Sequence, residues 1–200
     1  MKVEIEDVLF WMDAVRNSGD RDRALESFWK GQVRSKVWLA EVLESYATPV
    51  ESKIVIHGGW NGVLASILFN SNLNISEIHS YDIDPACEQT ACTVNKQQEI
   101  QGRFRAITGD STLQIYSADI VVNTICEHLT QEQYNSWLAL VPVTAMIVLQ
   151  SNNYFKCAEH IRCASTIKEF EEQSGIEVIH CAELETPLYT RFMLIGRKIV

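Results

Sequence analysis

The chain has 200 residues, of which 46% are hydrophobic and 22% are charged, and its formal net charge is −9. These values are typical of one soluble globular domain with a sizeable core. The acidic balance disfavours a broad nucleic-acid interface, because such an interface normally shows as a basic patch. The longest apolar run, residues 137–149, is shorter than the ~20 residues that a membrane-crossing helix needs. No membrane association is therefore expected.

The first residues and the cysteines indicate a compartment. Residues 1–15 mix acidic with apolar side chains, unlike a secretory signal. The six cysteines include no C-x-x-C pair and no matching histidine spacing, so no metal site is expected. Reduced thiols that serve as small core residues are the simplest interpretation. We therefore expect a cytoplasmic protein.

Residues 1–48 are predicted to form a helical extension of a single domain whose core is residues 49–200. Apolar residues recur at steps of three and four from Val8 to Val15, which predicts an amphipathic helix. A polar break at residues 17–20 separates this helix from a second one. A third helix is expected from Gly31 to about Tyr46.

Strand and helix patterns alternate from Lys53 onward, which predicts a parallel sheet with right-handed crossovers. Residues 54–56 form a short β-branched run, suited to a strand covered on both faces. A glycine turn then leads into a helix ending near Phe69, and a second strand ends on Asp82. The further elements expected are helices at 84–100, 131–140 and 165–175, and strands at 104–107, 119–123, 145–150, 177–181 and 191–199.

The last two strands are joined by a short turn at residues 186–188, so they must be antiparallel, because a parallel return needs a long crossover. The expected fold class is therefore α/β. It is a Rossmann-like, mostly parallel, seven-stranded sheet with an antiparallel C-terminal hairpin strand, helices on both faces and extra N-terminal helices.

The glycine turn narrows the choice of cofactor. An acidic residue roughly 20 positions after such a turn, at the tip of the next strand, holds a ribose hydroxyl in Rossmann-type sheets. A dinucleotide pattern G-x-G-x-x-G starting at Gly58 fails at Trp60 and Val63. The turn resembles the G-x-G-x-G turn of the class I S-adenosylmethionine (SAM) methyltransferase superfamily, with Gly58 and Gly62 as the outer glycines. The final hairpin is also the arrangement of that superfamily.

This resemblance implies SAM as the cofactor. The glycines would let the methionine part approach the backbone and the next helix N-terminus. Asp82 would accept the ribose hydroxyls, with Asp84 as the weaker alternative. Asp110 would accept the adenine amino group, or else serve as an ordinary turn aspartate. The predicted cofactor-binding set is His57, Gly58, Gly59, Trp60, Gly62, Asp82, Asp110 and Asn123.

Two positions depart from the superfamily pattern. Ile56 stands where an acidic residue usually helps to hold the cofactor's amino group, and His57 beside it is a candidate to take part of that role. Trp60 replaces the middle glycine, where it would narrow the pocket or lie against the ligand. These departures motivate an alternative function, a non-catalytic methyltransferase-like binding or assembly module.

The methyl acceptor is expected after the strand at 119–123, because ligands bind at the carboxyl edge of such sheets. Residues 123–126 lack the prolines and the aromatic residue of enzymes that methylate the amino groups of bases, so nucleic-acid methylation is a disfavoured alternative. His128 is the candidate general base, and Glu127 would orient it or bind a cationic acceptor. The pair would otherwise be an ordinary helix start. Cys126 is disfavoured as a nucleophile, because no activating partner is evident.

The sequence thus predicts a methyltransferase that acts on a small molecule or a protein side chain. A nicotinamide-dependent oxidoreductase is a further alternative, and nothing in the sequence identifies the acceptor.

Overall fold

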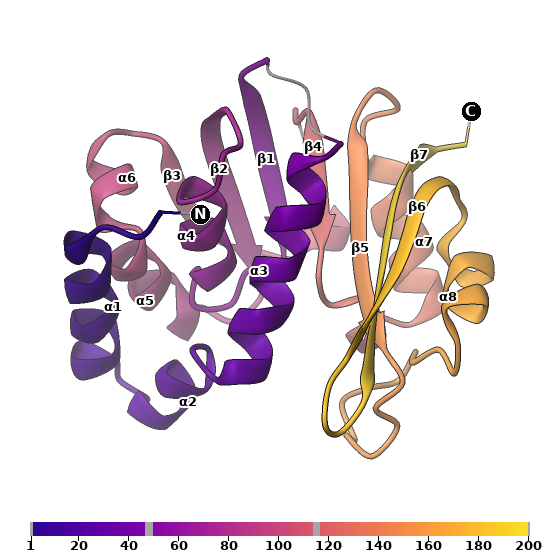
Figure 1. Cartoon of the computed structure of the whole chain (residues 1–200), viewed down its shortest axis with the longest axis horizontal. Helices are drawn as coiled ribbons and strands as arrows, with labels where there is room; N and C mark the ends of the chain where they lie inside the picture. The colour runs from indigo at the N-terminus through magenta and orange to yellow at the C-terminus, as the bar shows by residue number, and fades with distance from the viewer. Residues whose placement is uncertain (1, 47–49, 114–116, 200) are drawn as a thin grey trace. The chain divides into compact units, whose positions relative to one another are not determined.

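A computed structural model describes residues 2–46, 50–113 and 117–199. The chain divides into two compact units, residues 1–109 and 110–200. In Figure 1 the first unit runs from indigo to magenta and the second from pink to yellow. The expected single domain stays a prediction, and the boundary expected at residues 48 and 49 lies outside the described residues.

Three helices open the first unit: α1 (Ile5–Asn17), α2 (Arg21–Glu26) and α3 (Lys30–Glu44). The polar break predicted between the first two helices is present. Asp20 caps α2, because its side chain accepts a hydrogen bond from the backbone N–H of Arg23. The helix predicted from the apolar steps is also present, but Leu9 and Met12 of that stripe are 55% and 65% exposed.

The sheet of the first unit contains β1 (Ser52–His57), β2 (Ile75–Asp82) and β3 (Phe104–Thr108). β2 pairs in parallel with both neighbours, so β2 lies between them. Most of β1 is buried, as expected for an apolar run covered on both faces. The register places Asp82 beside Thr108, so β2 and β3 end at the same edge.

One helix prediction in this unit is wrong. A single helix was expected over residues 84–100, but the structure has α5 (Ala86–Val94) and α6 (Lys96–Ile100), in addition to α4 (Val63–Phe69) after the glycine turn. Asn95 interrupts the helix. Its buried side-chain amide donates hydrogen bonds of 3.0 Å to the carbonyl oxygens of Gly62 and Ala91. This tertiary contact fixes a non-helical backbone at Asn95.

The described residues of the second unit form four strands. β4 (Ile120–Asn123) and β5 (Met146–Asn152) are parallel, and β7 (Thr190–Lys198) lies between β5 and β6 (Ile176–Glu185), antiparallel to both. The predicted antiparallel hairpin is thus present, and β6 and β7 form a long ribbon (Figure 1). The helical segments of this unit are η1 (Ser111–Leu113), η2 (Cys126–His128), α7 (Gln131–Leu140) and α8 (Ile167–Ser174).

The core of the second unit is built around large aromatic side chains. Trp137 and Tyr134 on α7 are fully buried, as are Phe170 on α8 and Phe192 on β7. β6 is the outermost strand of this unit's sheet and alternates between covered and exposed positions. Its exposed side chains include Glu177, Glu183 and Glu185. Within the described part of the chain, no helix combines the length and apolar character needed to cross a bilayer.

Candidate functional site

The glycine turn of the first unit has three residues in the left-handed region of backbone space: Gly58 (φ 65°), Trp60 (φ 48°) and Gly62 (φ 74°). The backbone N–H of Gly59 donates to the carbonyl of Tyr81, and that of Gly62 donates to the carbonyl of Gly59. Trp60 therefore occupies a conformation that glycine adopts freely and that costs other residues about 1–2 kcal/mol. Such strain is characteristic of functional loops.

Packing accounts for two of the glycines. A Cβ atom on Gly59 would lie 1.8 Å from the hydroxyl oxygen of Ser80 on β2. A Cβ atom on Gly62 would lie 2.6 Å from the amide nitrogen of Asn95 and 3.0 Å from the Cα of Ala91. Gly62 therefore needs glycine whether or not a ligand binds, since its close contacts include the backbone of α5, whereas a side chain at Gly59 would require the Ser80 hydroxyl to move.

Asp82 connects the glycine turn to the end of β2. Its Oδ2 accepts a hydrogen bond of 2.8 Å from the backbone N–H of Trp60, and its Oδ1 accepts one of 3.0 Å from that of Asp84. The side chain is half-buried. A carboxylate has about four lone-pair sites, so acceptor capacity remains on both oxygens. Ile83, the next residue, is 74% exposed.

Asp84 is engaged differently. Its Oδ1 accepts a hydrogen bond of 2.9 Å from the backbone N–H of Ala86, at the start of α5. Its Oδ2 pairs with the guanidinium of Arg23, and this hydrogen bond holds the pKa of Asp84 below its ordinary value. Asp84 thus joins α2 to α5 and carries an ion pair, whereas both hydrogen bonds that Asp82 accepts come from backbone N–H groups.

A shallow hollow lies beside Asp82, with an empty volume of about 170 Å³ that includes open solvent. We call it the β2 hollow, since it follows the tips of β2 and β3 and the start of α5. The enclosed part is only about 10 Å³, about enough for one water molecule, so a nucleoside bound beside Asp82 would lie largely outside it, along the surface. It is lined by Trp60, Ser80, Asp82, Asp84, Cys87, Glu88, Ala106, Ile107 and Thr108.

His57 lies at the end of β1 and is fully buried. Burial lowers the pKa of His57 to about 3, so the imidazole is neutral at ordinary pH. Its ring stacks with that of Tyr81 at a centroid distance of 5.9 Å. A neutral, covered imidazole does not replace the charge of an acidic residue, and a role for His57 in the cofactor site stays a prediction.

The other two predicted cofactor residues belong to the second unit. Asp110 accepts hydrogen bonds of 2.8 Å from the backbone and the hydroxyl of Thr112, as a turn aspartate does. Asn123 ends β4 and is fully buried, and its Oδ1 accepts from the backbone N–H of Ile125. Its Nδ2 is buried and has no hydrogen-bond partner among the described residues. A buried donor without a partner is uncommon, so Asn123 is the better placed of the two to bind a ligand.

Glu127 is the centre of a polar cluster in the second unit. The side chain is almost fully buried, and its Oε1 accepts hydrogen bonds from Asn152 at the end of β5 and from Arg191 on β7. Arg191 also donates 2.9 Å to the carbonyl of Thr124. The sequence analysis missed both partners, because they meet only where β5 pairs with β7, which places Asn152 directly opposite Arg191.

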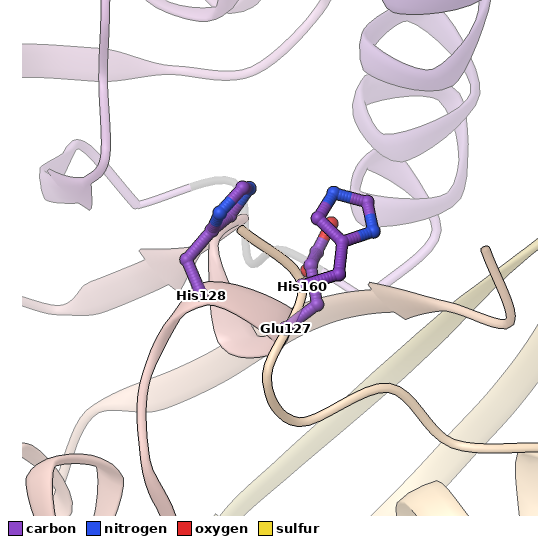
Figure 2. A group of neighbouring side chains, drawn as sticks. All are labelled: Glu127, His128 and His160. Atoms are coloured by element: carbon purple, nitrogen blue, oxygen red, sulfur yellow. The ribbon is translucent and has the colours of Figure 1, made fainter. Parts of the chain in front are cut away.

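His128 and His160 complete this cluster. The two rings lie edge to face at a centroid distance of 4.8 Å, and Figure 2 shows them beside Glu127. Burial lowers the pKa of His128, and the charge of Glu127 acts in the opposite direction.

Cys126, in contrast, is fully buried, and burial raises the pKa of its thiol to about 12, which makes it a poor nucleophile.

No protein-family model matches the chain, and no curated protein matches it by sequence. Solved structures do superpose on it. The magnesium protoporphyrin IX methyltransferase ChlM of Synechocystis PCC 6803, with bound SAM, has a TM-score of 0.67 and 12% identity, over 98% of this chain and 99% of that chain. The N-methyltransferase NodS of Bradyrhizobium japonicum WM9 has a TM-score of 0.62 and 14% identity, over 86% and 96%.

A third solved structure, a mutant of MtNAS in complex with S-adenosylmethionine, has a TM-score of 0.61 and 14% identity, over 96% of this chain and 72% of that chain. At these identities the likeness shows the fold. The predicted Rossmann-like α/β fold, with a mostly parallel seven-stranded sheet and an antiparallel C-terminal strand, is confirmed.

Proposed function

We propose that this chain, which has the class I methyltransferase fold, is a SAM-dependent methyltransferase that binds the nucleoside of SAM at Asp82. The observation that carries the proposal is the half-buried carboxylate of Asp82 at the border of the β2 hollow. The same edge of a Rossmann-type sheet is where ligands bind in general.

The remaining acceptor capacity of Asp82 suits a vicinal diol. Its two oxygens each hold one backbone N–H, and each can accept a further hydrogen bond from a ribose hydroxyl. Hydrogen bonds to an ionised group contribute about 1.5–3 kcal/mol each. The exposed side chain of Ile83 offers an apolar surface beside the sugar for the base. A role for Asn123, and for Asp110, in holding the cofactor is part of the proposal.

His128 is the proposed general base. Methyl transfer from a sulfonium depends mainly on in-line positioning of donor and acceptor, with removal of a proton where the acceptor carries one. Because burial lowers its pKa, the imidazole of His128 is neutral at pH 7 and can accept that proton. Glu127 already pairs with Arg191, so orienting His128 suits it better than binding a cationic acceptor.

The proposed acceptor is a small molecule or a protein side chain. The net charge of −9 disfavours a polyanionic acceptor such as nucleic acid. Solved structures of this fold include the magnesium protoporphyrin IX methyltransferase ChlM and a ribosomal protein L11 methylase, which has a TM-score of 0.57. A cytoplasmic location stays part of the proposal.

Calorimetric titration of the full-length protein with SAM and with S-adenosylhomocysteine tests the proposal. We expect binding at sub-millimolar concentration, and no heat with NADH. Asp82→Ala should weaken binding by at least roughly 10- to 150-fold, the effect of losing one of the two proposed charge-assisted hydrogen bonds. Asp13→Asn, at an exposed position on α1, is the control and should bind as the parent does. Absence of heat from folded protein at millimolar SAM and S-adenosylhomocysteine would refute the proposal.

A second candidate function is a non-catalytic binding or assembly module. The small volume of the β2 hollow and the strained Trp60 at its border favour it. The titration above separates the two candidates, because a module without a cofactor would show no binding of either nucleoside.

A further inference from the structure

Glu127, His128 and His160 bring three metal-ligating groups together in the second unit. One potential ligand atom from each side chain can be chosen so that the three atoms lie within 4.8 Å of one another. Glu127 and His128 come from η2, and His160 comes from the loop that follows β5 (Figure 2). The carboxylate is buried, while neither imidazole is. The group thus has a covered ligand on one side and is accessible on the other.

One oxygen of Glu127 is without a partner. Its Oε1 is held by Asn152 and Arg191, but its Oε2 is buried and has no hydrogen-bond partner among the described residues. An ionised oxygen that is removed from water and left without a partner carries a substantial desolvation cost. A bound cation would remove this cost, so the unpartnered Oε2 favours a cation independently of how close the three ligand atoms lie.

The hydrogen bond of His160 prepares its ring for coordination. Its Nδ1 lies 3.0 Å from the carbonyl oxygen of Tyr154. Because a carbonyl accepts hydrogen bonds and does not donate them, Nδ1 carries the proton and Nε2 keeps a free lone pair. Histidine ligands of metal ions are usually oriented by such a bond from the second ring nitrogen. Arg191 and Asn152 hold the carboxylate of Glu127 in the same manner.

We propose that Glu127, His128 and His160 bind a divalent transition-metal ion. Two imidazoles and one carboxylate are the ligand set of catalytic zinc sites and of non-haem iron(II) sites, both of which keep open positions. Calcium and magnesium are bound mainly by oxygen ligands and fit this set less well. The proposal departs from the expectation of no metal site, which rested on local spacing.

Metal binding requires the three ligand atoms to move closer together. With metal–ligand bonds of about 2.0–2.2 Å, two ligands of a tetrahedral ion lie about 3.4 Å apart. The widest pair of ligand atoms must therefore approach by roughly 1.4 Å relative to the observed limit of 4.8 Å. Rotation of the imidazoles, which are not buried, can provide this movement. The positive charge of Arg191 repels the ion, and the negative charge of the exposed Glu159, next to His160, partly compensates for this repulsion.

Metal binding goes beyond the proposed methyl transfer and does not depend on it. An ion here would polarise an oxygen ligand in an open position and lower the pKa of a hydroxyl. The acceptor class would then be an oxygen-bearing molecule able to coordinate the ion. With the ion bound, His128 would act as a ligand, so the role of general base proposed above belongs to the metal-free protein.

Cobalt(II) titration of full-length protein, stripped of metal with EDTA, tests this inference. We expect one equivalent of Co²⁺ to bind with a visible absorption band that Zn²⁺ displaces. Asn152→Ala should weaken the affinity by about 10- to 100-fold, as loss of an outer hydrogen bond does. His160→Ala should weaken it further and abolish the band. His180→Ala, on β6 of the same unit, is the matched control and should keep the band.

Three results would overturn the inference: no band or heat with millimolar Co²⁺, an unchanged band in His160→Ala, or a near-ultraviolet thiolate band that assigns the ion to cysteines. Circular dichroism checks that each variant is folded. If His160→Ala does not fold, His128→Gln gives the same readout. Metal binding should survive Asp82→Ala, so failure of the SAM proposal and failure of this one are distinguishable.

Discussion

Replacement of Asp82 by asparagine tests how the glycine turn is held, independently of any ligand. The carboxylate accepts one backbone N–H on each oxygen, from Trp60 at 2.8 Å and from Asp84 at 3.0 Å. Asparagine has one acceptor oxygen, and its amide nitrogen donates. Asp82→Asn must therefore leave one of these two N–H groups without its partner.

The magnitude follows from the charge and the exposure. A hydrogen bond to a charged group contributes about 1.5–3 kcal/mol, and the half-buried position of Asp82 allows water to replace part of it. We expect the free energy of unfolding to fall by about 2 kcal/mol. For a chain of this size, that change lowers the melting temperature by about 4–8 °C.

Urea unfolding and calorimetric melting of the ligand-free protein measure this change. Asp13→Asn, at an exposed position on α1, is the control and should stay within about 0.5 kcal/mol of the parent. If Asp82→Asn is as stable as the parent, the carboxylate does not hold the turn, and the geometry assigned to the β2 hollow is wrong.

Three further predictions concern other contacts. Gly62→Ala should destabilise the protein by about 2–4 kcal/mol in urea unfolding, because it combines left-handed strain with overpacking. Gly102→Ala, at a similar φ in open space, is the control and should cost only the strain of about 1–2 kcal/mol. Equal losses of stability in the two variants would contradict the packing explanation. Arg191→Met should cost about 3–5 kcal/mol, because it leaves the buried carboxylate of Glu127 without its cation, and Glu127→Gln in the same background should recover part of that loss in a double-mutant cycle. His57 has a pKa of about 3 in the folded protein and about 6.5 in the unfolded chain, so its contribution to the free energy of unfolding is complete above pH 6.5 and falls by about 2 kcal/mol at pH 5. His57→Gln should therefore reduce the loss of stability between pH 7 and 5 by that amount. An unchanged loss would argue against a buried neutral imidazole.

Local patterns sufficed for much of the fold. Helix α7 begins and ends at the predicted residues, because Thr130 and Gln133 form a capping box that is visible in the sequence. Asp82 was identified by its spacing from the glycine turn, and the structure places it at the tip of β2. Asn95 was not recognised as a helix break, because the bond that fixes it reaches back to Gly62.

The polar cluster could be predicted only in part. Glu127 and His128 stood out because they follow a strand tip. Arg191 and His160 did not, since their relation to Glu127 depends on how distant strands and loops meet. Arg191 is 64 residues away along the chain, and no local pattern records which strand it will lie beside. The sequence interpretation therefore left Glu127 without its ion pair to Arg191, which the structure shows.

The glutamates on the outer strand β6 have a bearing on self-association. An outermost strand presents unpaired backbone groups that invite a second copy to add another strand. Glu177, Glu183 and Glu185 are exposed along this strand, and two such rims brought together would repel each other. Replacing these glutamates by alanine would remove that repulsion and leave the strand open to edge-to-edge pairing with a second copy.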